Sequence, residues 1–304
     1  MVEINPGEQQ QTAHVYRLSA GQIALRTLIV IVSALIPLAL CAALRASGYA
    51  SRPPEPSIVP YEELVPVTPV PTPEPTPEPT PYIFGTPLEA SEAVADDAVF
   101  ENAVFLGDSR TEGLQIWGGI RAGRYHWARG MTVFRVDDPK HTIKVDGKAM
   151  TMMDALALQP YDKVYIMMGV NELGWPADLY EEGLGKFLDQ VIAAQPEAVI
   201  YLQLLPPLND DLAKKNLASY ENNDNVNTFN DIIVRAAREK QVVLLDTAEA
   251  FRDETGQLPA ELTADGCHFV KDGYLIWADY LRCHVMDPEL YFNSRDLAVP
   301  EEEI

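Results

Sequence analysis

The chain has 304 residues, 47% of them hydrophobic, so it can bury a sizeable core. Its formal net charge of −22 repels phosphate groups, which excludes nucleic acids and anionic lipid surfaces as expected partners. Its three cysteines exclude a disulfide-rich scaffold and a multi-cysteine zinc site.

The first organised segment is an uncharged apolar run, residues 27–44, which lies between Arg26 and Arg45. Together with its flanks it is long enough to span a bilayer. We therefore expect an N-terminal segment over 1–26 and a single transmembrane helix over 27–46. A cleaved signal peptide is the alternative, because small residues follow at 46–50. The long polar lead and the length of the run favour an uncleaved helix.

A proline-rich segment follows, and twelve of the 24 prolines lie between Pro53 and Pro81. Proline at alternate positions forces extended, polyproline-like backbone, so residues 47–87 are predicted to be a semi-rigid spacer. The alternative is a ligand for a proline-recognising domain. The basic residues flanking the apolar run are balanced. Because a Pro/Thr/Glu-rich spacer suits the outside of a cell, we place residues 1–26 in the cytoplasm and everything after the helix outside it.

Residues 88–290 have the composition of one globular domain, and 291–304 are expected to form a solvated tail. Short apolar runs without alternation predict strands buried on both faces, at 103–106, 163–168, 198–205 and 242–246. Helical spacing predicts helices at 177–194, 225–240 and 272–285, with Asp272 as the expected cap of the last. Residues 141–150 resemble a β-hairpin. Alternating strands and helices predict an α/β domain with a parallel sheet, whose active site lies at the carboxyl ends of the strands.

Two of four chemical signals lie in the first half of this domain. Gly107-Asp108-Ser109-Arg110 directly follows the first strand and precedes a helix expected at 111–117, so Ser109 can be exposed with its N–H free. A plain helix cap would explain the same serine. Gly130 follows an expected edge strand at 125–128, where a glycine lets backbone approach a ligand. A turn glycine is the alternative.

The other two signals follow later strands. Asn171 comes directly after the strand at 163–168, where its amide can donate to an oxyanion; it could also be a turn asparagine. Asp265 and His268 precede the last helix, and their spacing lets one turn present both side chains, with the carboxylate orienting the imidazole. A surface histidine is the alternative. Cys267 could be mistaken for the nucleophile, but it has no base of its own if His268 pairs with Asp265.

Taken in order, these four motifs resemble the SGNH (GDSL) hydrolase family over about residues 98–287. The resemblance implies a flavodoxin-like three-layer α/β/α fold, with Ser109 as nucleophile, His268 as general base and then acid, and Asp265 as its orienting partner. It also implies an oxyanion hole made by the N–H groups of Ser109 and Gly130 and the side chain of Asn171. No cofactor and no metal are expected.

The sequence departs from the family pattern next to these positions. Arg110 stands where many members have leucine, and Glu172 stands where aspartate is common, so both are expected to bear on substrate choice. Glu112, Trp117, Glu172 and Trp175 are placed to line the cleft, although surface charge and core packing explain them equally well. The spacing of Cys267 and Cys283 permits a disulfide without requiring one.

The expected function is that of a membrane-anchored, extracytoplasmic serine esterase acting through an acyl-enzyme. The anchor and spacer indicate an ester-bearing glycan of the cell envelope or the extracellular space as substrate, with an O-acetyl group as the first choice. An acyltransferase with the same triad is the nearest alternative. A catalytically idle glycan-binding module is the third.

Overall fold

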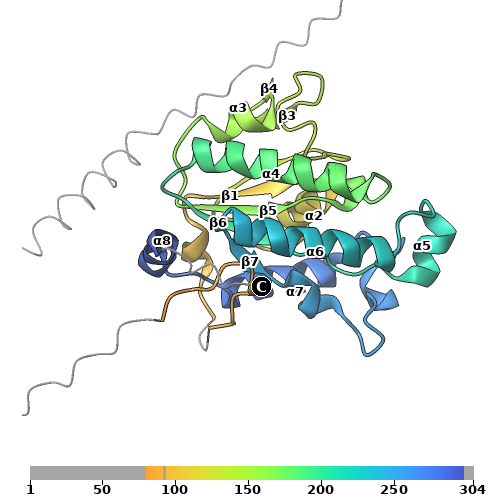
Figure 1. Ribbon diagram of the computed structural model, residues 1–304. Coiled ribbons are helices and arrows are strands. Elements are labelled where there is room, and N and C mark those ends of the chain that lie inside the picture. The colour runs from red at the N-terminus through yellow and green to blue at the C-terminus, as the bar shows by residue number, and fades with distance from the viewer. Residues whose placement is uncertain (1–79, 92–93, 298–304) are drawn as a thin grey trace, which may run out of the picture. The chain divides into compact units, whose positions relative to one another are not determined.

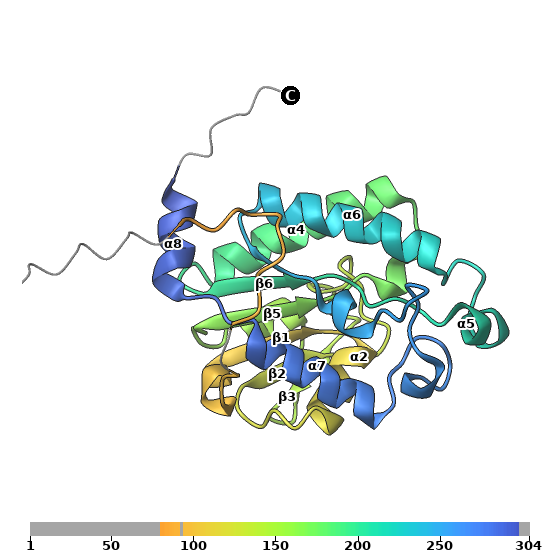
Figure 2. The ribbon, with the colours of Figure 1, turned by 90° about the horizontal axis from the view of Figure 1, so that it is seen from below.

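The computed structural model describes residues 80–91 and 94–297, and over these residues it forms a three-layer α/β/α arrangement. Helices α4 and α6 cover one face of the central sheet, and α2 and α7 cover the other (Figures 1 and 2). The strands of the central sheet are β1 (Ala103–Gly107), β2 (Arg124–Trp127), β5 (Lys163–Met167), β6 (Val199–Gln203) and β7 (Val243–Leu245). The α-helices are α2 (Ser109–Trp117), α3 (Met152–Leu156), α4 (Ala177–Ala194), α5 (Asp210–Asn216), α6 (Asn223–Glu239), α7 (Lys271–Cys283) and α8 (Pro288–Asp296).

The central sheet is parallel throughout, in the order β2-β1-β5-β6-β7. When these five strands are numbered along the chain, the order reads 2-1-3-4-5, which is the flavodoxin-type order. The chain first steps from β1 to β2 at one edge and then crosses back to β5, so its direction reverses beside β1. This confirms the expected parallel α/β sheet.

An aromatic row holds four strands in register. Tyr125, Phe105, Tyr165 and Tyr201 are paired across β2, β1, β5 and β6, and neighbouring rings stack with centroids 4.7, 5.0 and 4.4 Å apart. A slip of one residue would turn each of these rings to the opposite face of the sheet. The row therefore also fixes where the carboxyl ends of β1 and β5 lie relative to each other.

A small hairpin lies between β2 and the second half of the sheet, as the sequence predicts. Strands β3 (Ile143–Val145) and β4 (Lys148–Met150) pair antiparallel. The two turn residues, Asp146 and Gly147, both have positive φ (49° and 79°), as a two-residue type I′ turn requires.

The prediction that Asp272 caps the last helix is wrong. Helix α7 begins one residue earlier, at Lys271, and its N-cap is Val270, which supplies no side-chain hydrogen bond. Asp272 instead lies in the first turn, where its negative charge favourably faces the helix dipole.

The two ends of the described chain pack on the domain. Leu88 N–H donates to Leu244 O, and Tyr82 N–H donates to Ser294 Oγ on α8, whose Tyr291 is buried. Within residues 80–91 and 94–297, no helix combines the length and apolar character that a bilayer crossing needs. The run expected to span the membrane lies outside these residues.

Candidate active site

The site lies where the chain reverses direction in the sheet, at the carboxyl ends of β1 and β5. Gly107 and Met167, the last residues of these strands, are paired in register. Helix α2 starts at Ser109, directly past β1, and the short 3₁₀ helix η3 (Val170–Glu172) carries Asn171 past β5. Because the connections after β1 and β5 lead to opposite sides, an open crevice forms between them.

Ser109, His268 and Asp265 form one hydrogen-bonded row. Ser109 Oγ lies 2.8 Å from His268 Nε2, and His268 Nδ1 lies 2.7 Å from Asp265 Oδ2. A carboxylate accepts only, so Nδ1 carries the proton and Nε2 presents its lone pair to the serine hydroxyl. The arrangement can take a proton from Ser109 and hold the resulting imidazolium.

The loop that carries Asp265 and His268 is folded around the carboxylate. Asp265 Oδ1 accepts hydrogen bonds from the N–H groups of Cys267 and His268, at 2.9 and 2.8 Å. Burial opposes ionisation of Asp265, but these two bonds and the bond from the imidazole outweigh it and lower the pKa of the carboxyl. Thr263 Oγ1 ties the loop ends together by donating to His268 O and accepting from Gly266 N–H.

Helix α5 supports this loop from outside. Gly266 has a φ of 103°, and a Cβ there would lie 2.5 Å from the Ala213 nitrogen, so only glycine fits. Asn216 Nδ2 donates to Asp265 O at 3.4 Å, and Asn209 N–H donates to Gly266 O. The position of the acid–base pair therefore depends on α5, a helix not identified in the sequence.

Two of the three expected oxyanion donors face the same crevice. Ser109 is the first residue of α2, so its N–H has no acceptor within its own helix. Asn171 Nδ2 donates to Met131 O at 3.0 Å and to Asp108 Oδ2 at 3.3 Å. Both partners are acceptors, so the amide nitrogen must point toward them. An oxyanion at Ser109 would compete with the longer of these two contacts.

Gly130 lies in an exposed turn between two residues that touch the site. Its φ of 69° is left-handed, and a Cβ there would meet nothing within 4 Å. On one side, Arg129 pairs with Glu112 through two hydrogen bonds of 2.5 and 2.9 Å; on the other, Met131 O holds Asn171. The structure thus brings the Gly130 turn to the crevice, and the role of its N–H remains a prediction.

A cleft of about 390 Å³ opens beside Ser109 and His268. Its remaining lining residues are Glu112, Gly113, Ile116, Trp117, Arg129, Phe269 and Tyr274. The Tyr274 ring approaches closely because residue 113 is glycine: a Cβ there would lie 1.9 Å from the ring. Glu112 and Trp117 line the cleft as the sequence suggested, whereas Trp175 is not among its lining residues.

Five of these lining residues were not predicted from the sequence. Gly113 and Ile116 could have been, because helical spacings of three and four residues place them on the same helix face as Ser109 and Glu112. Arg129, Phe269 and Tyr274 come from distant segments, so only the packing of α7 and of the Gly130 turn against α2 brings them in.

Charged residues lie beneath the site. Asp108, Arg110 and Glu172 are all buried, and Arg110 Nε lies 3.7 Å from Asp108 Oδ1. Glu172 Oε1 accepts from Val133 N–H at 2.7 Å. Burial, reinforced by the charge of Asp108, raises the pKa of Glu172 to about 8 despite this bond and the nearby Arg110. Neither Arg110 nor Glu172 reaches the cleft surface, so the expectation that Glu172 lines the cleft is wrong. That the two positions bear on substrate choice stays a prediction.

The two cysteines of the described domain are free thiols. Cys267 is buried, and burial raises the pKa of its thiol to about 12, so it stays protonated and is a poor nucleophile. Ser109 Oγ, by contrast, is hydrogen-bonded to the His268 imidazole. A serine hydroxyl bonded to an imidazole that a carboxylate orients is the arrangement that serine hydrolases use.

Comparison with known proteins defines the family. The model of the GDSL-like lipase/acylhydrolase family matches residues 105–276, and the chain belongs to that family. It is accordingly a hydrolase of the esterase type. The matched stretch runs from β1 into α7 and so includes each of the residues in the hydrogen-bonded row. No match was found among curated proteins.

Three solved structures are similar to the chain at low identity. An acetylxylan esterase from Geobacillus stearothermophilus is 18% identical, with a TM-score of 0.43 over 61% of this chain and 94% of the other. A second acetyl xylan esterase is 17% identical, with a TM-score of 0.45 over 60% and 99%. A GDSL-like lipase from Bacteroides thetaiotaomicron is 14% identical, with a TM-score of 0.46 over 62% and 89%. The roles assigned below therefore rest on the geometry of this site.

Proposed function

We propose that this chain is a membrane-anchored, extracytoplasmic serine esterase that removes an ester group, in the first place O-acetyl, from a glycan of the cell envelope or extracellular space. The observation that carries the chemistry is the continuous row from Ser109 Oγ through His268 to Asp265, with contacts of 2.8 and 2.7 Å. These lengths are within hydrogen-bond reach for proton transfer. The anchor and the glycan rest on the sequence features of residues 27–87.

In the proposed first step, Ser109 Oγ attacks the ester carbonyl while His268 Nε2 takes its proton. Asp265 stabilises the imidazolium and stays ionised, consistent with its lowered pKa. The carbonyl oxygen becomes an oxyanion beside the N–H of Ser109, and the Asn171 amide is the second donor. His268 then protonates the leaving sugar hydroxyl, which leaves an acyl-serine.

In the second step, water takes the place of the released hydroxyl. His268 removes a proton from the water as it attacks the acyl carbonyl, and the same donors hold the second oxyanion. Collapse of this intermediate returns the proton to Ser109 Oγ and releases the free acid. The cycle balances without a cofactor, since each proton taken by His268 is given back within the same step.

The cleft suits an ester on a neutral sugar better than one on a charged polymer. Trp117 presents an exposed ring beside Ser109, which suits the apolar face of a sugar. The charge of Arg129 is already paired by Glu112. The chain as a whole is strongly acidic, so anionic polymers are repelled at long range.

The test is hydrolysis of a short-chain aryl ester and of an O-acetylated glycan by the purified full chain in detergent, compared with Ser109→Ala. We expect free acid from the wild type and a loss of about 10⁴-fold or more in kcat for the variant. Equal activity of the two proteins would reject the nucleophile, and an inactive wild type with unimpaired glycan binding would indicate a binding module.

The same experiment separates an esterase from an acyltransferase. An acceptor glycan is added to the aryl-ester reaction, and the acyl group is followed into either free acid or acylated glycan. We expect mostly free acid, because Ser109 and His268 are partly exposed and water reaches them directly. Mostly acylated glycan would overturn the hydrolase assignment and keep Ser109 as nucleophile.

A further inference from the structure

Three exposed aromatic rings lie in segments that follow strands of the central sheet. Among the described residues, the exposed aromatic side chains are Trp117, Tyr220 and Trp175, at 49%, 48% and 42%. They lie in the segments that follow β1, β6 and β5, all past carboxyl ends of the sheet. Trp117 belongs to the cleft beside Ser109. Trp175 and Tyr220 lie outside that cleft and have no part in the chemistry proposed above.

Trp175 is held as a rigid platform. Its ring stacks on Phe134 with centroids 4.8 Å apart and planes 16° from parallel. Phe134 in turn packs on α4 at Gly183, where a Cβ would lie only 2.4 Å from the Phe134 ring. One face of the indole is thus covered by protein, and the side chain remains 42% exposed. Because its orientation is set in advance, a ligand stacking on it loses little conformational entropy.

Tyr220 is held in the same way by the neighbouring loop. A Cβ at Gly174 would lie 3.0–3.1 Å from three atoms of the Tyr220 ring, so the ring rests on the bare backbone of residue 174. Asn225 Nδ2 donates to both Leu173 O and Tyr220 O and so joins the two loops. The two rings therefore lie on adjoining segments. The segment with Gly174 and Trp175 begins only three residues past Asn171.

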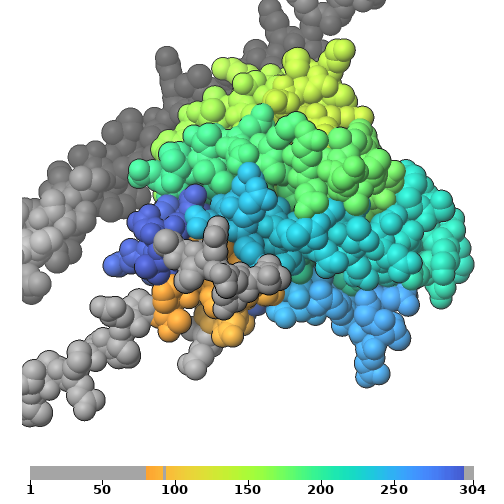
Figure 3. Space-filling model, viewed as in Figure 1, coloured from red at the N-terminus to blue at the C-terminus, as the bar shows by residue number. Residues whose placement is uncertain are grey.

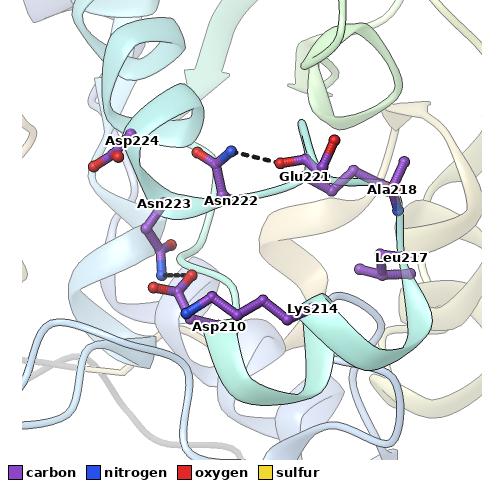
Figure 4. Close-up of a pocket in the computed structure, with 9 residues that line it drawn as sticks. Asp210, Lys214, Leu217, Ala218, Glu221, Asn222, Asn223 and Asp224 are labelled. Carbon is purple, nitrogen blue, oxygen red and sulfur yellow. Dashed lines mark hydrogen bonds between the residues drawn. The ribbon is translucent and has the colours of Figure 1, made fainter.

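Polar side chains lie next to Tyr220. Its chain neighbours, Ser219 and Glu221, line a hollow of about 540 Å³ between α5 and α6. Helix α5 lies in the part of the domain that projects at the right of Figure 3. Asp210, Asn222, Asn223 and Asp224 line it with carboxylates and amides, as Figure 4 shows. Flat apolar rings interspersed with such groups match sugar rings, which have C–H faces and hydroxyl edges.

We propose that Trp175 and Tyr220 form a second binding site, an aromatic rim that holds a neutral sugar chain while its ester is presented to Ser109. The proposal rests on the function proposed above and assigns its substrate as a polymer rather than a single sugar. An extended acyl chain would need one continuous apolar trench, whereas the hollow next to Tyr220 is lined mostly by polar side chains. An anionic polymer would meet three carboxylates, Asp210, Glu221 and Asp224, against the single cation of Lys214 in the same hollow.

The first test compares polymer and small substrate in the full chain. The double variant Trp175→Ala/Tyr220→Ala is assayed on acetylated xylan and on a short-chain aryl ester. We expect kcat/KM on the polymer to fall about tenfold or more, through KM, with aryl-ester kinetics within about twofold of wild type. Trp175→Phe/Tyr220→Phe should retain most polymer activity, and Leu158→Ala, an exposed apolar residue after α3, should change nothing.

The outcomes separate this proposal from the esterase assignment. An equal loss on both substrates, or no loss on the polymer, overturns the rim. The second measurement uses the full-chain Ser109→Ala protein in gels cast with deacetylated xylan, mannan or β-glucan, where no ester is needed. We expect at least one glycan to slow the migration of Ser109→Ala more than that of the triple variant Ser109→Ala/Trp175→Ala/Tyr220→Ala. Equal migration of the two proteins in all three gels overturns the rim even if the esterase is fully active.

Discussion

The crevice side of the active site and the layer beneath it contain residues that are neighbours in the chain but differ in exposure and in hydrogen bonding. On the crevice side, Ser109, Asp265 and His268 are partly exposed and linked to one another by hydrogen bonds. Directly beneath, Arg110 and Glu172 are buried, and Arg110 Nε and Nη2 and Glu172 Oε2 have no hydrogen-bond partner among the described residues. Ser109 and Asn171, which face the crevice, are thus each followed directly in the chain by a buried side chain, Arg110 and Glu172.

This contrast shows what the departures from the family pattern do. Arg110 in place of leucine and Glu172 in place of aspartate are both in the buried layer, together with Asp108. Burying an unpaired charge costs several kcal/mol; here Arg110 lies close to Asp108, and burial keeps Glu172 in its neutral form. The three residues form a buried floor (Asp108, Arg110 and Glu172), and Asp108 connects this floor to the crevice because its other oxygen accepts from Asn171.

The largest effect is expected from Asp265→Asn in the crevice layer. An amide at position 265 favours the wrong imidazole tautomer, which places a proton on Nε2 facing Ser109, so kcat should fall about 10⁴-fold. Steady-state kinetics on an aryl ester measure the loss. Asp272→Asn, which changes an exposed carboxylate in the first turn of α7, is the matched control and should keep full activity. A loss smaller than tenfold for Asp265→Asn would rule out its orienting role.

A smaller effect is expected from Asn171→Ala. Removal of one oxyanion donor costs about 10²- to 10³-fold in kcat, and KM should change little because the amide acts on the transition state. The matched variant is Glu172→Gln, in the next residue. It keeps the oxygen that accepts from Val133 N–H, so its kcat should stay within a few-fold of the wild-type value. If the two substitutions reduced kcat equally, the distinction between crevice and floor would fail at this loop.

The smallest effect is a pH-dependent change in stability from Glu172→Gln. The pKa of Glu172 is raised to about 8 by burial, so the folded state holds its proton more tightly than the unfolded state. The wild type therefore loses stability as pH rises from about 4.5 through 8, and the glutamine variant lacks that loss. The groups facing Glu172 are Asp108, Arg110 and Tyr180.

Thermal melts at pH 5 and pH 8 measure this difference. The Tm of Glu172→Gln minus that of the wild type should become more positive at the higher pH. A constant or falling difference would mean that Glu172 is ionised in the folded protein. The Asp265 carboxyl has the opposite effect on stability. Because its pKa is lowered, its contribution to stability is lost as the pH falls, whereas that of Glu172 is lost as the pH rises, so the two carboxyls can be told apart.

Much of the fold was predictable because its strands are short, apolar and bounded by glycine or proline. The helix at 177–194 was predicted to the residue, since its buried side chains recur at helical spacing. Helices α3, α5 and α8 were missed, because they have five to nine residues and few buried side chains each. Asp272 was misassigned because an acidic residue in the first turn resembles a cap in sequence.

The site was predictable where a strand end and a motif coincide, as at Ser109 and Asn171. The sequence could not predict which side chains near the site are buried. Glu112 and Glu172 both look like charged residues beside a motif. In the structure, however, Glu112 pairs with the exposed Arg129, whereas Glu172 is fully buried. Burial is decided by the packing of α2, η3 and the Gly130 turn, which are far apart in the chain.

The order of the site residues along the chain has a consequence for biosynthesis. Ser109 and Asn171 are translated early, whereas Asp265 and His268 follow all five strands of the sheet. On the proposed mechanism, a nascent chain that stops short of Thr263 carries Ser109 and Asn171 but not the proposed base. The site is therefore complete only after the loop with Asp265 and His268 has been added to a sheet whose strands are already translated.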